Sequence, residues 1–337
     1  MSLKNTRVVL ASRPRGRAAE SDFRIETVDL QSPADGEVQL KNLWVSVDPY
    51  MRGRMDATKS YTKGLEVGDV MVARTIAEVI ESRHPDYRPG DLVTADGNWQ
   101  SHLVARGPGL RRIDPSLVSD AIPLTWHLGI LGMPGTTAWI GMMHIGAPKA
   151  GETAVVSAAS GAVGMTAVQL AKIAGLRVVG IAGGPDKCAW VERELGADEC
   201  IDYKAPDWTE RLAAATPNGV DVYFDNVGGP ILDAVLERVN FFARIPLCGL
   251  ISRYDTGERQ PLRNVHQILI NRVMMQGFIV FDRPELVERA VAALHEHARA
   301  GRLRYRESVS DGLESAPRAL LGLLEGRNFG KQLVRLA

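Results

Sequence analysis

A run of small residues between Ala158 and Gly164 constrains the fold of this chain more than any other part of its sequence. The apolar stretch Ala154 to Val156 leads into the run, and an amphipathic stretch from Met165 to Ala174 follows it. Small side chains at such a turn let a pyrophosphate reach the backbone N–H groups at a helix N-terminus, whereas a bulky side chain would hold it away. This order predicts the dinucleotide-binding turn of a Rossmann domain, the alternative being a tight turn that binds nothing.

Strands and helices alternate after this turn, as a parallel sheet with helical crossovers requires. The alternation predicts an α/β fold with a doubly wound parallel sheet. The predicted strands are Arg177 to Ile181, Cys200 to Asp202, Val220 to Asn226 and Arg244 to Leu250, and the predicted helices are Asp186 to Leu195, Trp208 to Ala215 and Ile231 to Val239.

The first third of the chain differs, because its short apolar stretches alternate with turns rich in Gly, Pro and Asp. Val38 to Val47, Val70 to Ile80 and Leu92 to Thr94 are predicted strands of an antiparallel β domain. A length of 337 residues exceeds what one core usually supports, which also favours two domains. We expect the late apolar stretches Tyr305 to Val309 and Leu333 to Leu336 to rejoin the first domain. The expected β-rich domain therefore contains residues 1–125 and 301–337, and the Rossmann domain contains residues 126–300.

Composition excludes several classes of partner. The chain has 40 basic and 40 acidic residues, so no net charge attracts nucleic acid or an anionic membrane, and we expect a small molecule or another protein chain as partner. Three cysteines are too few for a disulfide framework and form no CxxC pair, as is typical of a reducing compartment. The sequence has no recognisable secretory signal and no apolar run long enough to span a bilayer. These features predict a cytoplasmic protein.

The end of the second predicted strand distinguishes between the two nicotinamide cofactors. NAD enzymes usually place Asp or Glu there, where the carboxylate bonds the ribose 2′-hydroxyl and repels a 2′-phosphate. This chain has Gly183 and Gly184 at that point, and Lys187 follows, a cation suited to phosphate. Asp186 argues in the other direction, and a solvated position in the first helical turn is the alternative for Lys187. On balance the pattern favours NADPH.

Several further motifs occur together: AASGAVG, AGGPDK, IDYK, FDNVGG, CGLIS and NFGK, and in the first half VDPYMRGRM and GDLVTADGNWQSHLV. With them the chain resembles, over nearly its whole length, the zinc-independent medium-chain dehydrogenases and reductases. The branch is that of prostaglandin and leukotriene reductases, alkenal double-bond reductases and bacterial curcumin reductases. The resemblance implies a GroES-like catalytic domain made from both chain ends, a Rossmann domain between them, and cofactor and substrate in the cleft. It also implies a homodimer formed by edge pairing of the Rossmann sheets.

The resemblance gives roles to individual residues. The pyrophosphate would be held by Gly161, Ala162, Val163 and Gly164. Lys187 and Tyr203 would lie at the 2′-phosphate, and Asn226 would line the cofactor cleft. Taken singly, Tyr203 could be a half-buried aromatic residue, and Asn226 or Asn328 a turn former. The residues expected around the nicotinamide half are Cys248, Gly249, Leu250, Ile251, Ser252, Tyr254, Phe278, Ile279, Val280 and Asn328.

The zinc ligands of the zinc-dependent relatives are missing. Those relatives place a Cys and a His-Glu pair in the first domain, whereas here the first cysteine is Cys188 and the corresponding stretch, Gly64 to Gly68, contains no His. A tetrahedral site of N and S ligands is therefore not expected. His295 and His297 flank Glu296 without the HExxH spacing, which favours a solvated helix. Without a metal to polarise a hydroxyl, alcohol oxidation is disfavoured.

Reduction of an activated alkene needs less, since hydride can add to the β-carbon of an enone if a donor stabilises the developing enolate. Tyr254 is the candidate donor, because it resembles the tyrosine that follows the CGxIS motif in the family, near the nicotinamide. The phenol can donate a hydrogen bond at neutral pH. A loop tyrosine that only packs is the alternative. Tyr50 and Trp99 would form an aromatic wall for a flat conjugated substrate, although each is equally compatible with a core position.

The chain departs from the prostaglandin-reducing members at one point. They carry a second tyrosine in the stretch that here reads Gln267 to Arg272 and contains none, so the resemblance leans toward the bacterial double-bond reductases. The leading hypothesis is an NADPH-dependent reductase of the α,β double bond of enals and enones. Two alternatives remain: an NADPH quinone reductase, and a redox sensor that binds NADPH without turnover.

Overall fold

The computed structural model describes residues 3–57, 60–255 and 260–336, and it divides them into two compact units. Unit 1 contains the described residues of Met1–Leu128, Tyr254–Thr256 and Glu307–Ala337. Unit 2 contains those of Gly129–Arg253 and Gly257–Arg306. This agrees with the expected two-domain α/β fold, in which a β-rich unit is built from both ends of the chain around a Rossmann unit.

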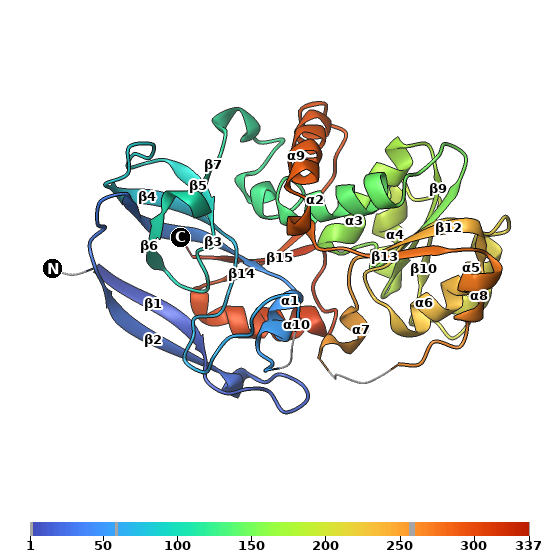
Figure 1. Ribbon diagram of the computed structural model, residues 1–337, viewed down its shortest axis with the longest axis horizontal. Coiled ribbons are helices and arrows are strands. Elements are labelled where there is room, and N and C mark those ends of the chain that lie inside the picture. Colours follow the sequence, from blue (N-terminus) through green and yellow to red (C-terminus); the bar gives the residue numbers. More distant parts are fainter. Residues whose placement is uncertain (1–2, 58–59, 256–259, 337) are drawn as a thin grey trace. The chain divides into compact units, whose positions relative to one another are not determined.

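Unit 2 is built on a parallel sheet of six strands in the order β10-β9-β8-β11-β12-β13 (Figure 1). The order reverses direction beside β8, and in open parallel sheets ligands bind outside the carboxyl ends of the strands at such a switch point. All five side chains of β8 are buried, as a strand covered on both faces requires. The strands are β8 (Thr153–Ser157), β9 (Arg177–Ala182), β10 (Glu199–Asp202), β11 (Val220–Phe224), β12 (Val239–Leu247) and β13 (Met274–Gly277).

Helices cover both faces of this sheet (Figure 1). On one face, apolar side chains of α5 and α6, including Leu212 and Val235, pack on Val155 and Ile181 of the central strands. On the other, α3 packs against β8 and α2, and α4 packs against β9 and β10. These helices are α2 (Met133–Trp139), α3 (Ala162–Ile173), α4 (Pro185–Leu195), α5 (Trp208–Ala215) and α6 (Gly229–Leu236), with η5 (Ile140–Ile145), α7 (Ile251–Tyr254), α8 (His266–Ile270) and α9 (Pro284–Arg299) completing the unit's main helices.

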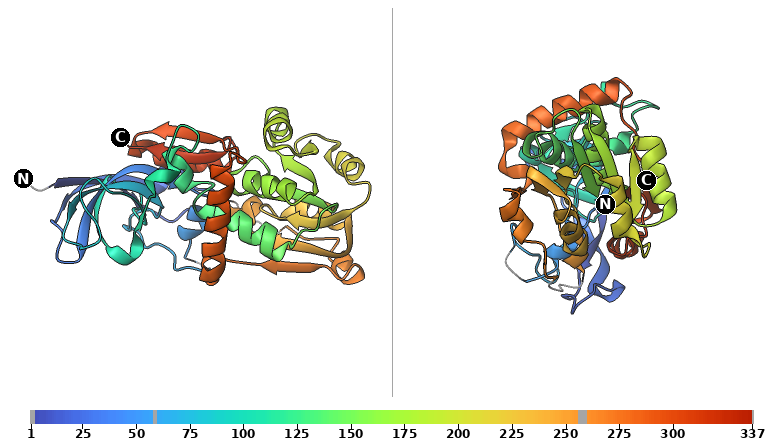
Figure 2. Two further views of the ribbon diagram at one scale, coloured as in Figure 1. Left: turned by 90° about the horizontal axis from the view of Figure 1, so that it is seen from above. Right: turned by 90° about the vertical axis from the view of Figure 1, so that its right-hand side faces the viewer.

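Unit 1 has a largely antiparallel sheet in the order β14-β15-β3-β4-β5-β7, with β6 also on β3, and a separate β1–β2 pair. The C-terminal strand β15 lies between β14 and β3, so the red C-terminal strands lie beside a strand from the first part of the chain (Figure 2). The strands are β1 (Leu3–Leu10), β2 (Phe23–Leu30), β3 (Glu37–Val47), β4 (Thr75–Ser82), β5 (Leu92–Ala95), β6 (His102–Arg106), β7 (Arg111–Arg112), β14 (Glu307–Asp311) and β15 (Lys331–Arg335), and the helices are α1 (Tyr50–Arg54) and α10 (Ala316–Leu324).

Three segments differ from the sequence expectation. β12 begins at Val239, whereas the sequence predicts a strand only from Arg244. The pairing of β12 with β11 is irregular, and Phe241 and Phe242 are exposed, so the apolar pattern that indicates a buried strand is interrupted. β4 begins at Thr75, since Val70 forms only an isolated bridge with Val9. Residues 301–306 lie in unit 2, where Gln169 bonds both the N–H and the C=O of Arg304.

Candidate functional site

The turn at Ala158 to Gly164 forms a cradle at the start of α3. Ala158 has a positive φ of 48°, and its carbonyl accepts the N–H of Gly161 at 2.8 Å, which closes the turn. Gly161 is the N-cap of α3, so the N–H groups of the next residues have no partner within the helix. A Cβ at Gly164 would lie 2.1 Å from the Ala158 oxygen, so only glycine fits this position. The cradle therefore suits an anion such as a pyrophosphate.

Ala159 occupies the position where a first glycine commonly stands. Its N–H donates to the Ile181 carbonyl on β9 at 3.0 Å, and its side chain is fully buried. A Cβ at Gly180 would lie 3.1 Å from the Ala159 Cβ, which shows how closely turn and strand approach. An alanine is tolerated at 159 because glycine at 180 supplies the missing space.

A cationic corner lies where β9 and β10 end. Lys187 stands in the first turn of α4, and burial, followed by the nearby charge of Lys204, lowers its pKa. A Cβ at Gly183 would lie 2.9 Å from Tyr203 Cε1 and 3.2 Å from Lys204 Cε, so both side chains lie over this glycine. The corner thus contains two lysines and a tyrosine hydroxyl, which fits a phosphate on the ribose. Lys204, missed from the sequence, follows Tyr203 directly in the IDYK motif.

The Asp202 carboxylate, at the end of β10, accepts hydrogen bonds from the backbone. Asp202 Oδ1 accepts the N–H of Gly184 at 2.8 Å and that of Lys204 at 3.0 Å. Asp186 is exposed in the first turn of α4, where a negative charge favours the helix N-terminus. The carboxylates here therefore support the turn and the helix, and Lys187 and Lys204 are the positive charges of the corner.

The carboxyl ends of β8 and β11 are joined by a hydrogen-bonded network. Asn226 Nδ2 donates to the Ser157 carbonyl at 2.7 Å, and the Asn226 N–H donates to Ser157 Oγ at 2.9 Å. Asp225 is fully buried, and its Oδ1 accepts from Tyr223, Ser157 and the N–H groups of Val227 and Gly228. Burial raises the pKa of Asp225. Sequence reasoning found Asn226 but missed Asp225 and Ser157, which fix its position.

The loop after β12 lies over this network. The Asp225 carbonyl accepts the N–H of Cys248 at 2.8 Å and that of Gly249 at 3.1 Å. Ser252 donates its N–H at 3.2 Å and its Oγ at 2.7 Å to the Val227 carbonyl. Leu250 packs on Gly228, where a Cβ would lie 2.5 Å from its Cδ2. Burial raises the pKa of Cys248 to about 12, so this sulfur is a thiol at neutral pH. The loop, with Ile251 opening α7, is thereby fixed to the FDNV segment.

The segment after β13, Phe278 to Val280, is half-buried to buried in unit 2. Phe278 lies against Gly141, where a Cβ would be 2.9 Å from its Cζ. Val280 is buried in an apolar cluster with Ile140 and Leu286, and Ile279 lies half-buried between the two.

Four expected site residues belong to unit 1. Trp99 is fully buried and stacks on Phe23 with ring centroids 5.7 Å apart, so it takes the core position that the sequence left open. Tyr50 opens α1 half-buried against the same core, and burial together with Asp48 raises its pKa. Asn328 donates to the Gly330 carbonyl at 2.7 Å, and Tyr254 is half-buried at the end of α7.

Within residues 3–57, 60–255 and 260–336, no group of three or more His, Cys, Asp or Glu side chains is arranged to hold a metal ion. No helix of this part of the chain is long and apolar enough to cross a membrane.

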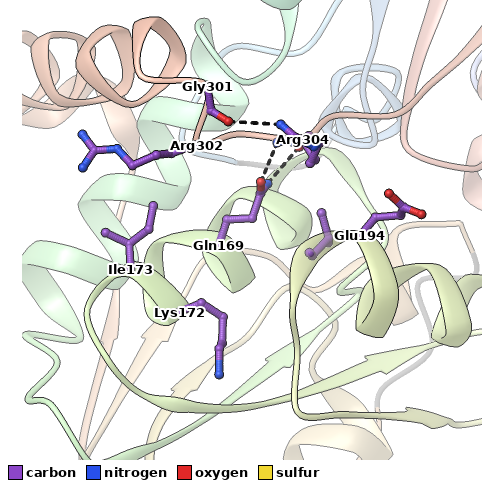
Figure 3. A pocket seen from close by; sticks show the side chains of 8 residues that line it. Gln169, Lys172, Ile173, Glu194, Gly301, Arg302 and Arg304 are labelled. Carbon is purple, nitrogen blue, oxygen red and sulfur yellow. Dashed lines mark hydrogen bonds between the residues drawn. The ribbon is translucent and has the colours of Figure 1, made fainter.

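A cavity of about 230 Å³ in unit 2 lies at the C-terminal end of α3, beside Lys172, Ile173 and Arg304 (Figure 3). It lies at the opposite end of α3 from the cradle at Ala158 to Gly164.

Comparison with known proteins agrees with this geometry. Two family models match: an N-terminal domain of oxidoreductase over residues 6–113 and a zinc-binding dehydrogenase over residues 162–296. The chain is 43% identical to the NADPH-dependent curcumin reductase of Escherichia coli K12, covering 99% of this chain and 97% of the relative. It is 39% identical to the NADP(+)-dependent 2-alkenal reductase of Nicotiana tabacum, covering 99% and 98%. The structure of CurA from Vibrio vulnificus in complex with NADPH matches with a TM-score of 0.92 and 43% identity, covering 98% of this chain and 99% of that one.

Proposed function

Because this chain belongs to the zinc-independent branch of the medium-chain dehydrogenases and reductases, and is an NADPH-dependent reductase of the curcumin, alkenal and prostaglandin reductase type, we propose that it reduces the α,β carbon–carbon double bond of enals and enones. NADPH binding, the cofactor part of the proposal, is supported by the cradle at the start of α3 and by the cationic corner with Lys187 and Lys204. The printed names of the relatives support the substrate class.

In this proposal, separate groups of residues bind the phosphates and the nicotinamide half of NADPH. The N–H groups of Ala162, Val163 and Gly164 bind the pyrophosphate, and Lys187, Lys204 and Tyr203 bind the 2′-phosphate. The loop from Cys248 to Ser252, together with Asn226, Phe278 to Val280 and Asn328, would surround the nicotinamide half. Bound NADPH supplies the hydride.

Tyr254 is the proposed catalytic residue. Its phenol donates a hydrogen bond to the substrate carbonyl oxygen, and this bond strengthens as a hydride adds to the β-carbon and negative charge develops on that oxygen. The α-carbon then takes one proton, so the net reaction consumes one hydride and one proton. Tyr50 would face the conjugated substrate, whereas Trp99 supports the same region from the core.

An acceptor screen tests the reaction class. NADPH oxidation is followed with a medium-chain 2-alkenal, an aryl enone and a quinone. We expect turnover of the first two, with the saturated carbonyl compound as product. Activity confined to the quinone would instead establish a quinone reductase. Binding of NADPH without turnover of any acceptor would establish a redox sensor.

A substitution tests the tyrosine. Tyr254→Phe removes the donor and should lower kcat for the enone about 10²- to 10³-fold, the usual effect of removing one oxyanion donor. The NADPH Kd should remain within twofold. Tyr87→Phe is the matched control, because its hydroxyl only bonds the Leu110 carbonyl at 3.2 Å within unit 1, and it should retain kcat. Unchanged turnover in Tyr254→Phe would refute the catalytic role.

We also propose a homodimer formed through the β13 edge of unit 2. β13 ends the sheet and contains Met274, which is 42% exposed. Phe242 in β12 is 65% exposed and Leu269 in α8 is 81% exposed. Such a patch beside a strand edge favours pairing with a second copy. Light scattering after size exclusion should give twice the chain mass. Leu269→Glu should shift the mass toward a monomer, while Ile25→Glu, at an exposed position of unit 1, should not.

A further inference from the structure

Asp255 follows Tyr254 directly and is held by unit 1. Its Oδ1 accepts the N–H of Ala18 at 3.1 Å and lies 3.7 Å from Arg52 Nε. Its Oδ2 lies 3.9 Å from Arg17 Nε, and the side chain is only 18% exposed. The chain passes from unit 2 to unit 1 between Arg253 and Tyr254, so Tyr254 and Asp255 both belong to unit 1.

Arg52 is the buried centre of this arrangement. It lies in α1 with 4% of its surface exposed, and its Nη2 donates to the Gly16 carbonyl at 2.7 Å. Nη1 pairs with Asp56 at 2.7 Å, and Nε faces Asp255. A buried guanidinium needs carboxylates around it, because an uncompensated charge in the interior is costly. The Asp255 carboxylate is therefore placed by the hydrogen bond from the Ala18 N–H and adds to the negative charge around Arg52.

Tyr254 ends α7, a helix of four residues, and so short a helix is not stable by itself. Asp255 supplies a fixed point one residue further on. Arg52 lies in α1, which Tyr50 opens, so the residue that faces Asp255 and the second tyrosine belong to one helix of unit 1.

We propose that Asp255, held by Arg52 and the Ala18 N–H, is a positioning residue that sets the orientation of Tyr254 for the reaction; this rests on the catalytic role proposed above for Tyr254. Asp255 does not touch the substrate. It acts through the peptide that links it to the tyrosine. The effect of losing it should therefore fall on kcat and depend on the presence of the Tyr254 hydroxyl.

A double-mutant cycle tests the proposal. Asp255→Ala should lower kcat for an aryl enone about 10- to 100-fold, as expected for a misplaced catalytic group. The NADPH Kd should stay within twofold, since the cradle and the cationic corner belong to unit 2. In the Tyr254→Phe background the same substitution should change kcat less than twofold, because neighbouring residues that act as one unit are not additive. Arg15→Ala, in the same exposed loop as Arg17, is the control and should retain kcat.

Asp255→Asn keeps an acceptor for the Ala18 N–H and removes the charge that faces Arg52, so it carries the same test if Asp255→Ala does not fold. Thermal unfolding identifies that case. A full loss of kcat from the Asp255 substitution in the Tyr254→Phe background, or retention of kcat in both Asp255 variants, would overturn the positioning role while the proposed function stands. Retention of kcat in Tyr254→Phe alone would overturn the proposed role of Tyr254 and the inference with it.

Discussion

Lys187→Ala tests how the chain distinguishes NADPH from NADH. The substitution removes the ammonium group at the first turn of α4 and leaves Lys204 and Tyr203 in place. Lys187 is half-buried beside Gly183 and Gly184, where solvent screens its charge less than at an open surface. The loss should therefore fall on the cofactor that carries a 2′-phosphate.

The structure sets the expected size of this effect. A hydrogen bond to a charged group contributes about 1.5–3 kcal/mol, and about 1.4 kcal/mol corresponds to tenfold in affinity. Lys204 remains at the corner and compensates for part of the lost charge, which places the expected change toward the lower end. We expect the Kd of NADPH to rise about 10- to 50-fold and that of NADH to change less than twofold.

Fluorescence titration with both cofactors measures the two constants. Lys172→Ala is the matched control, since it removes a lysine of the same unit roughly 16 Å along α3 from Gly161. Lys172 pairs with Asp198 at 2.8 Å beside the cavity of Figure 3, and its loss should leave both constants unchanged. High salt should reduce the difference between NADPH and NADH in the unaltered protein. An equal loss of both cofactors in Lys187→Ala would refute the 2′-phosphate role.

Two further predictions concern the cradle and a buried acid. Gly164→Ala places a Cβ 2.1 Å from the Ala158 oxygen, which should lower Tm by about 2–10 °C and weaken NADPH binding. Gly53→Ala is the control, because its added Cβ has no atom within 4 Å, and it should change neither Tm nor NADPH binding. Burial raises the pKa of Glu307 above 4.5, so as pH rises the unfolded state loses this proton before the folded state does. The free energy of unfolding of the unaltered protein, relative to that of Glu307→Gln, should therefore fall as pH rises from 4.5. Urea unfolding at pH 5 and pH 7.5 measures this, and parallel pH dependences would contradict it.

Local patterns indicated candidates for the cofactor half of the site. The Ala158 to Gly164 turn could be named because its residues are adjacent in sequence and form one strand-turn-helix unit. Lys204 was missed because its closeness to Lys187 depends on α4 folding back beside β10. The start of β12 was missed because an irregular ladder exposes Phe242.

Contacts between distant positions could not be predicted. Arg52 and Asp255 are far apart in the sequence, and nothing in either local pattern indicates their pairing. Trp99 shows the same difficulty, since its motif fits a wall or a core and only its stacking on Phe23 decides. Asp225 gave no signal because a buried carboxylate that organises backbone N–H groups has the same sequence pattern as a strand end.

Gly183 limits the routes by which the cofactor preference could change. The familiar conversion to NADH introduces a carboxylate at the end of the second strand, which is this position. Here an added Cβ would lie 2.9 Å from Tyr203 Cε1 and 3.1 Å from its hydroxyl oxygen, so the exposed Tyr203 side chain would have to turn away from the corner. On the proposed role of Tyr203, that movement removes its contact with the 2′-phosphate. A carboxylate at position 183 should therefore weaken NADPH binding twice, by its charge and by displacing Tyr203.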